Sequence, residues 1–259
     1  DCHEVKSFIF NTIANFRITK SRGVIAQFDR ESFDEYFTIT RIGDGSIGGK
    51  ARGLAFLDSL VKRNHLYNKY KDIDITIPKT VVLCTDVFDE FMEENKLYPI
   101  ALSDQYSDEE ILQHFLDASL PQRIHDDLRT VISWVERPVA RRSSSLLEDS
   151  HYQPFAGIYA TKMLPNDQVT DDIRFLNLVN AIKFVYASTF FRTAKAYIES
   201  TNHRIEEEKM AVIVQELVGR QYEDLFYPAV SGVAPPLCRT TRNPSWTLTV
   251  TWSAAETKL

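Results

Sequence analysis

Cysteine is scarce in this chain of 259 residues, and its three copies, Cys2, Cys84 and Cys238, lie far apart in the sequence. No Cys-x-x-Cys pair is present, and the six histidines show no metal-ligand spacing with the cysteines. The sequence therefore offers neither a disulfide framework nor a zinc site, and we expect a reduced, cytoplasmic protein. The chain begins at Asp1 without a signal peptide, and we expect a processed product or a segment of a longer protein.

Long apolar runs and an excess of positive charge are also missing. No run approaches the ~20 apolar residues that a membrane-spanning helix needs, so we expect no membrane partner. The formal net charge is −6 and no basic face stands out, which argues against a nucleic-acid partner. With 44% hydrophobic and 25% charged residues, the composition is that of a globular protein, built as one large domain or two smaller lobes.

Glycine is uncommon as well, yet four of the nine glycines fall within seven positions of the segment Gly43-Asp-Gly-Ser-Ile-Gly-Gly-Lys50. Glycine lets backbone N–H groups approach an anion closely, and a helix that begins behind such a loop adds a favourable dipole. Lys50 would add a positive charge beside phosphate oxygens. The segment therefore indicates a phosphate site, most plausibly for a nucleotide, although glycines that only form a tight turn between a strand and a helix would look the same.

Known phosphate motifs fit this glycine segment imperfectly. The Walker A pattern fails because Asp44 stands where its first glycine belongs and Ala51 where its Ser or Thr belongs. The dinucleotide pattern G-x-G-x-x-G is present, but no ribose-binding acid follows at the expected distance. A protein-kinase glycine loop requires a second strand, whereas the sequence after Lys50 turns helical.

Apolar periodicity places helices and strands alternately along the chain. Residues 37–42 alternate apolar and polar side chains and predict a strand that enters the glycine segment. Residues 50–62 predict a helix. Its predicted inner face consists of Ala51, Leu54, Leu57, Leu60 and Val61. The β-rich residues 73–83 are followed by a predicted helix with Thr85 or Asp86 as its N-cap.

The remaining segments complete a mixed α/β pattern, with helices and strands interspersed. Helical patterns occupy residues 5–36, two stretches within residues 103–136, and residues 182–197. Strands are predicted at residues 138–140 and 210–214, and residues 247–252 could form an edge strand or a hairpin.

A second group of polar residues lies a hundred positions after the glycine segment. Arg142-Ser-Ser is followed by Glu148-Asp149, Phe155-Ala-Gly157 and Thr161. An arginine beside hydroxyl groups and a glycine turn suits a polyphosphate. The alternative is an arginine paired with Glu148 or Asp149, with the serines in a surface loop.

The order of these motifs resembles a known family. Gly-Gly-Lys, Ile77-Pro, Arg-Ser-Ser-x-x-x-Glu-Asp, Phe-Ala-Gly, Val-x-Ala-Ser at residues 185–188 and Val-x-Val-Gln ending at Gln215 are similar to the N-terminal nucleotide-binding domain of phosphoenolpyruvate synthase and pyruvate phosphate dikinase. The resemblance covers residues 41–233 and implies an ATP-grasp-like, two-lobed domain that is incomplete on its C-terminal side. Residues 1–40 are then a helical N-terminal extension, and residues 234–259 an unmatched tail with a possible hairpin.

The resemblance also implies roles for individual residues. Lys50 and Arg142 are the expected catalytic residues on the ATP phosphates. The expected ATP-binding residues are Gly48, Gly49, Lys50, Arg142, Ser143, Gly157, Thr161, Gln215, Glu216 and Val218. ATP and Mg²⁺ are the expected cofactors, but the acidic metal ligands of the family's second lobe have no counterpart after residue 233.

The implied function is the nucleotide-binding part of a phosphoenolpyruvate synthase-like enzyme. It would bind ATP and Mg²⁺ and transfer a phosphoryl group to a histidine carrier on the way to pyruvate. The expected partners are the nucleotide and the phosphohistidine and pyruvate-binding domains of a longer protein. The alternative is a degenerate, non-catalytic ATP-binding module that regulates a partner.

Overall fold

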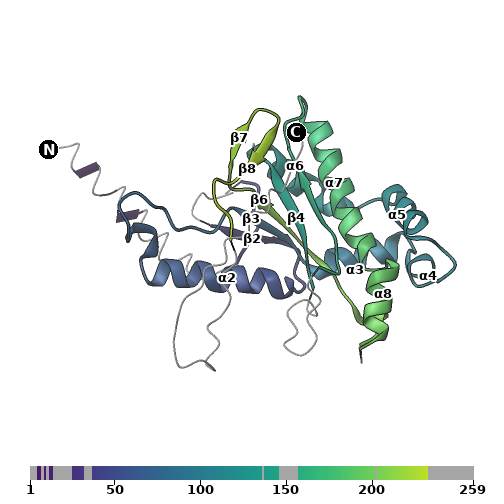
Figure 1. Ribbon diagram of the computed structural model, residues 1–259. Coiled ribbons are helices and arrows are strands. Elements are labelled where there is room, and N and C mark those ends of the chain that lie inside the picture. Colours follow the sequence, from purple (N-terminus) through teal and green to yellow (C-terminus); the bar gives the residue numbers. More distant parts are fainter. Residues whose placement is uncertain are drawn as a thin grey trace, which may run out of the picture.

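A six-stranded mixed sheet forms the centre of the molecule (Figure 1). The computed structural model describes residues 5–6, 9, 12–13, 25–31, 37–135, 137–145, 157–201 and 203–232. The strand order is β1-β2-β3-β6-β4-β5, in which β1, β2 and β3 run parallel and the β3–β6, β6–β4 and β4–β5 pairs are antiparallel. The strands are β1 (Ala26–Gln27), β2 (Ile39–Ile42), β3 (Thr80–Leu83), β4 (Val139–Ser144), β5 (Thr161–Leu164) and β6 (Ala211–Glu216). The predicted mixed α/β class is confirmed.

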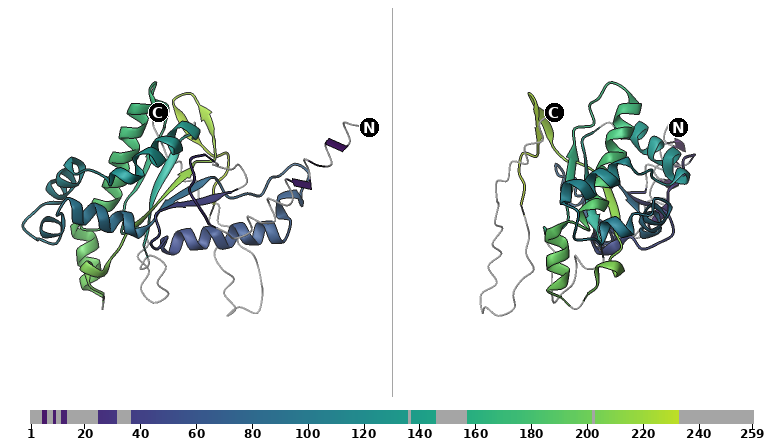
Figure 2. Two further views of the ribbon diagram at one scale, coloured as in Figure 1. Left: turned by 180° about the vertical axis from the view of Figure 1, so that it is seen from behind. Right: turned by 90° about the vertical axis from the view of Figure 1, so that its right-hand side faces the viewer.

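Helices occupy the connections from β2 to β3, from β3 to β4 and from β5 to β6. They are α2 (Gly48–Arg63), α3 (Thr85–Glu94), α4 (Tyr98–Ala101), α5 (Asp108–Asp117), α6 (His125–Trp134), α7 (Asp171–Ser188) and α8 (Arg192–Glu199). A separate hairpin, β7 (Arg220–Tyr222) and β8 (Leu225–Tyr227), stands at one end of the sheet, and α8 lies at the other (Figures 1 and 2). None of the described helices combines the length and the apolar character needed to cross a lipid bilayer.

The two faces of the sheet bury different side chains, because successive residues of a strand point to opposite sides. Val81, Leu83, Val212 and Val214 belong to the large core that also contains apolar residues of α3, α5, α6 and α7. On the other face, a smaller cluster joins the strands to α2. Its buried members are Ile39, Ala51, Ala55, Val82, Ala211 and Ile213.

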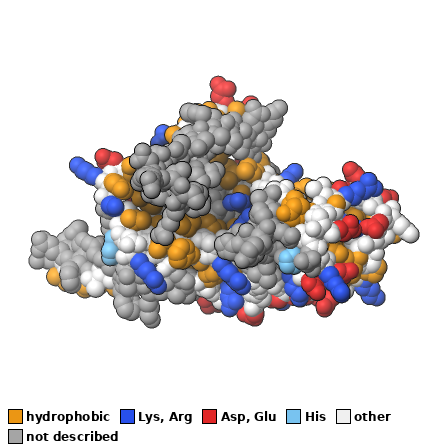
Figure 3. Space-filling view, turned by 60° about the horizontal axis from the view of Figure 1, so that its bottom comes forward, with side chains coloured by type: hydrophobic (Ala, Val, Ile, Leu, Met, Phe, Trp, Pro, Cys, Tyr) orange, Lys and Arg blue, Asp and Glu red, His pale blue; other side chains and the backbone are white. Residues whose placement is uncertain are grey.

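The predicted inner face of α2 is wrong in part. Leu57 and Leu60 are 48% and 37% exposed, beside Phe56 at 63%. The buried side of the helix instead carries small and polar residues: Gly48, Ala51, Ala55, Asp58, Ser59 and Lys62. Asp58 and Lys62 can be buried because they form an ion pair at 2.8 Å. On the side of the molecule where α2 lies, Figure 3 shows hydrophobic and basic side chains next to each other.

The predicted helix over residues 182–197 is also wrong, because two helices occupy this region. α7 ends at Ser188, and Phe191 is extended before α8 begins at Arg192. The break places Phe190 in the core, with ring centroids 6.3 Å from Phe88 and 5.9 Å from Phe115. Phe190 is fully buried there, and burial of a large aromatic side chain stabilises this turn.

Other predicted boundaries need smaller corrections. Residues 26–27 form β1 in the main sheet, so the helical prediction for residues 5–36, which lie in the predicted N-terminal extension, is wrong at these two residues. The strand predicted at residues 138–140 continues to Ser144, and within residues 73–83 the named strand β3 begins only at Thr80. Residues 247–252 lie outside the described residues.

Candidate functional site

The glycine segment folds around the beginning of α3. The Asp86 carboxylate accepts the N–H groups of Asp44 at 3.1 Å and Gly45 at 3.0 Å, and the Thr85 hydroxyl accepts that of Ser46 at 3.0 Å. The predicted N-cap role of Thr85 or Asp86 is therefore wrong: Cys84 is the N-cap of α3, and both side chains turn to the glycine segment.

Close packing explains the first two glycines. A Cβ on Gly43, whose φ is +98°, would lie 2.4 Å from Oδ1 of Asp86. A Cβ on Gly45 would lie 2.6 Å from the backbone nitrogen of Asp86. Both distances are far below van der Waals contact, so only glycine fits.

Arg123 holds the Asp86 carboxylate from the other side. Its Nη2 donates to Oδ2 of Asp86 at 3.0 Å, and its Nε donates to Glu90 at 2.6 Å. Burial opposes ionisation of Asp86, but the N–H groups of Asp44 and Gly45 and the Arg123 guanidinium outweigh it and lower the pKa of this carboxyl group.

The N-terminus of α2 docks against the end of β4. The N–H of Gly48 donates to Oγ of Ser46 at 3.3 Å, and that of Gly49 to the Ser145 carbonyl at 3.0 Å. The Ser144 hydroxyl accepts the N–H of Ala51 at 3.2 Å and donates to the Ile47 carbonyl at 2.9 Å. These bonds satisfy N–H groups that a helix start otherwise leaves without partners.

This docking brings the two sequence motifs together. Nζ of Lys50 lies 3.4 Å from the Ser143 hydroxyl, although 93 residues separate them. Ser143 is buried, whereas the adjacent Arg142 is exposed. Lys50 is partly buried and lies near the C-terminal end of β4, beside the Arg142-Ser-Ser motif.

Strand register places Arg142 and Thr161 on one face of the sheet. On the same face, α2 packs against residues of β2, β3 and β6. Arg142 pairs with Ile213 on one side and with Thr161 on the other. Ile213 packs with Ala51 and Ala55 of α2, and residues in register share a face. Both Arg142 and Thr161 are exposed there, so a ligand can reach them.

The residues predicted to contact adenine lie at the end of β6 and just after it. Gln215 lies two residues beyond Ile213 and shares its face, and its Nε2 donates to the Thr80 hydroxyl at 2.9 Å. The N–H of Glu216 donates to the Lys79 carbonyl at 3.0 Å, and Val218 is 62% exposed. Gly157 is exposed with φ +78°, and a Cβ there would meet no atom within 4 Å.

Arg141 differs sharply from its neighbour Arg142. It is fully buried on the opposite face of the sheet, in register with Val214 of the large core. Its Nη1 donates to the Val139 carbonyl at 3.4 Å, and its Nε and Nη2 have no hydrogen-bond partner in the part of the chain that the structure describes. Burial lowers the pKa of Arg141 to about 9.

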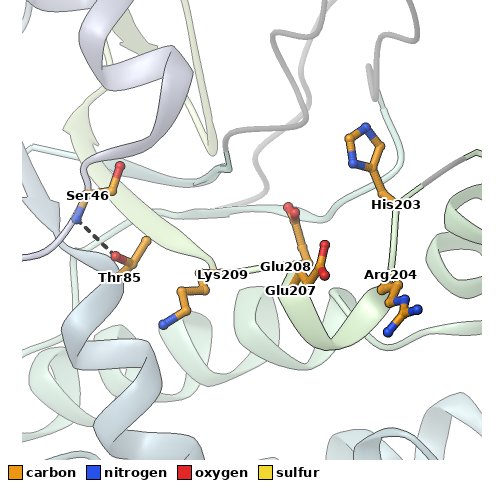
Figure 4. Close-up of a pocket in the computed structure, with 7 residues that line it drawn as sticks. All are labelled: Ser46, Thr85, His203, Arg204, Glu207, Glu208 and Lys209. Carbon is orange, nitrogen blue, oxygen red and sulfur yellow. Dashed lines mark hydrogen bonds between the residues drawn. The ribbon is translucent and has the colours of Figure 1, made fainter.

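Sequence reasoning missed a cavity of about 180 Å³ beside the glycine segment. Ser46 and Thr85 stand on one side of it and His203 and Arg204 on the other (Figure 4). Its further lining residues are Glu207, Glu208 and Lys209. The missed residues precede β6, far from the glycine segment in sequence, and no local motif marks them. Missed as well were Ser144 and Asp86, which hold the segment in place.

The described residues contain no group of three or more His, Cys, Asp or Glu side chains placed to hold a metal ion. Three acidic residues close to the glycine segment contact arginines: Asp86 and Glu90 contact Arg123, and Asp44 contacts Arg41 at 3.8 Å. This part of the chain does not fit the Mg²⁺ site that the resemblance implies, and we assign no step to a metal ion.

The sequence of the chain is similar to known proteins. Over 156 residues, 59% of the chain, the sequence is 26% identical to the uncharacterized phosphotransferase YvkC of Bacillus subtilis (strain 168), and the match covers only 17% of that protein. The family described as pyruvate phosphate dikinase, AMP/ATP-binding domain, matches residues 44–256, past the point where the sequence motifs end. The chain therefore belongs to the family of the pyruvate phosphate dikinase AMP/ATP-binding domain.

Proposed function

We propose that this chain binds ATP on the exposed part of the sheet face that carries Arg142, Thr161 and Gln215. The observation that carries the proposal is the docking of the α2 N-terminus on Ser144, because Ser144 accepts the N–H of Ala51 and lies two residues beyond Arg142, on the same face of β4. Two cationic side chains and neighbouring hydroxyl groups are the donors that a polyphosphate requires.

The arrangement along β6 supports an order for the nucleotide. Ile213 lies opposite Arg142, and Glu216 follows three residues later. At about 3.3 Å per residue, this separates the phosphate-side arginine from the base-side residues by roughly 10 Å. An extended nucleotide would place its phosphates near Lys50 and Arg142 and its base near Gln215, Glu216 and Val218. Gly48, Gly49, Gly157 and Thr161 are proposed to surround the phosphates. Ser143 is buried on the opposite face of β4 and is proposed to act only through its contact with Lys50.

We propose that the chain is part of a longer protein, in which the bound ATP is a phosphoryl donor. Lys50 and Arg142 would neutralise charge on the phosphates and align the transferred group, since phosphoryl transfer depends mostly on positioning and electrostatics. A histidine in another domain would accept the phosphoryl group, with pyruvate as the final acceptor. The ATP-grasp-like clamp with a second lobe, and Mg²⁺ bound by that lobe, belong to the same proposal.

Thermal unfolding with and without Mg²⁺-ATP tests nucleotide binding. At a ligand concentration 100-fold above Kd, binding stabilises the folded chain by about 2.7 kcal/mol, which raises Tm by roughly 5–11 °C at this size. Lys50→Ala and Arg142→Ala each remove a charged hydrogen bond and are expected to weaken binding about 10- to 150-fold. Lys162→Ala is the matched control. It removes the same charge one residue after Thr161, and because successive side chains of β5 point to opposite faces, Lys162 points away from the proposed site.

Retention of the full Tm shift in Lys50→Ala and Arg142→Ala would refute the proposed site, and no shift in the wild-type chain would refute nucleotide binding. Phosphohistidine detected by mass spectrometry in the full-length protein after incubation with ATP would support transfer. Binding without any phosphohistidine would instead favour the regulatory ATP-binding module.

A further inference from the structure

We infer that Asp86 is a positioning residue, which occupies the anion cradle of the glycine segment and thereby fixes Lys50 in the site. For its effect on ATP this inference rests on the proposed function. Its part about the glycine segment rests only on the hydrogen bonds between this segment and residues 85 and 86.

The cradle consists of consecutive N–H groups that converge on the first turn of α3. Those of Asp44 and Gly45 reach separate oxygens of the Asp86 carboxylate, and that of Ser46 reaches the Thr85 hydroxyl. Consecutive backbone N–H groups arranged in this way form a nest that binds anions. The carboxylate of Asp86 is that anion, so a phosphate does not bind at these N–H groups.

The charge of Asp86 is compensated from outside the cradle as well. Arg123 contacts Oδ2, the oxygen that also accepts the N–H of Asp44. The same guanidinium binds Glu90 one turn along α3. The carboxylate is therefore held between the backbone N–H groups of Asp44 and Gly45 and the guanidinium of Arg123. If it left the cradle, it would lose its hydrogen bonds to all three.

The cradle determines where α2 begins. Ser46, fixed through Thr85, accepts the N–H of Gly48 and the Nη2 of Arg52, at 3.3 and 3.2 Å. Lys50 is the third residue of the helix that starts at Gly48. A shift of Ser46 therefore moves the helix start, and with it the ammonium group that lies beside Ser143.

Amide hydrogen exchange on the nucleotide-free protein tests the cradle directly. In Asp86→Ala the N–H groups of Asp44 and Gly45 lose a charged acceptor, and we expect them to exchange at least 10-fold faster. Asp86→Asn keeps one acceptor oxygen and is expected to restore part of the protection. Glu90→Ala is the matched control, because it removes the other carboxylate bound by Arg123 and touches no N–H of the cradle.

ATP affinity provides the second arm. We expect Asp86→Ala to weaken ATP binding at least 10-fold, Asp86→Asn to weaken it less, and Glu90→Ala to leave it within 2-fold of wild type. Unchanged exchange in both Asp86 variants would overturn the inference, and so would tighter ATP or inorganic phosphate binding by Asp86→Ala, since the cradle would then be the phosphate site. If the wild-type chain binds no ATP, the proposed function fails while the exchange rates still decide on the cradle. If Asp86→Ala does not fold, Asp86→Asn carries both measurements.

Discussion

Replacing Gly48 by alanine is expected to destabilise the protein by about 3–5 kcal/mol, near the upper end of single-residue effects. Gly48 has φ +73°, a conformation that costs an L-residue about 1–2 kcal/mol. In addition, a Cβ at this position would lie 1.8 Å from the carbonyl oxygen of Ser144. Because that oxygen belongs to the backbone of β4, the collision is relieved only if α2 moves away from the sheet.

Gly53→Ala is the matched control, since Gly53 lies on the same helix and a Cβ there would meet no atom within 4 Å. Alanine is expected to stabilise α2 at this position by up to about 1 kcal/mol. Urea denaturation of both variants measures the difference in the free energy of unfolding. A Gly48→Ala variant as stable as the wild type would show that α2 does not dock on β4 as described.

Elements with strong local signals could be predicted from the sequence. β2 and α2 were predicted because alternation in residues 37–42 gives way to helical periodicity at the glycine segment. The continuous apolar run of residues 210–214 predicted β6 because a strand buried on both faces needs no polar side chain. The approach of Lys50 to the Arg-Ser-Ser motif followed from a resemblance in motif order, because neither motif alone specifies what it contacts.

Features that depend on long-range contacts could not be predicted. Leu57 and Leu60 look like the inner face of α2, but only the fold shows that Lys62 reaches both Asp58 and Thr38 and so lies inside. The glycine segment was predicted to cradle an anion. The sequence gives no sign that an internal carboxylate, 41 residues after Gly45, occupies the cradle.

Arg141 shows how far burial can depart from what a sequence suggests. Adjacent arginines in Arg141-Arg142 look equivalent, yet strand alternation exposes one and buries the other completely. A buried cation in which two of the three nitrogens have no partner among the described residues is destabilising, since it loses hydration and gains only one long hydrogen bond in return.

Arg141→Met is therefore expected to stabilise the protein by about 1–4 kcal/mol at pH 7, the range found when buried ions are replaced by apolar side chains. Arg142→Met is the matched control: it removes the same charge from an exposed position, and we expect a change within about 0.5 kcal/mol together with weaker ATP binding. Urea denaturation of the three proteins measures both effects. Destabilisation by Arg141→Met would show that the guanidinium has a stabilising partner.

The pH dependence provides a separate check on Arg141. Its pKa is about 9 in the folded protein, well below the ordinary value for arginine, so the unfolded chain binds the proton more tightly. Below pH 9 the side chain is charged in both states and its burial cost is fully present. Above pH 9 the folded protein releases the proton while the unfolded chain keeps it, and the cost falls as the pH rises toward the ordinary pKa of arginine. The stability difference between Arg141→Met and wild type should therefore be constant from pH 7 to pH 8 and smaller at pH 10. A difference that is the same at pH 7 and pH 10 would mean that packing, rather than the buried charge, distinguishes the two proteins.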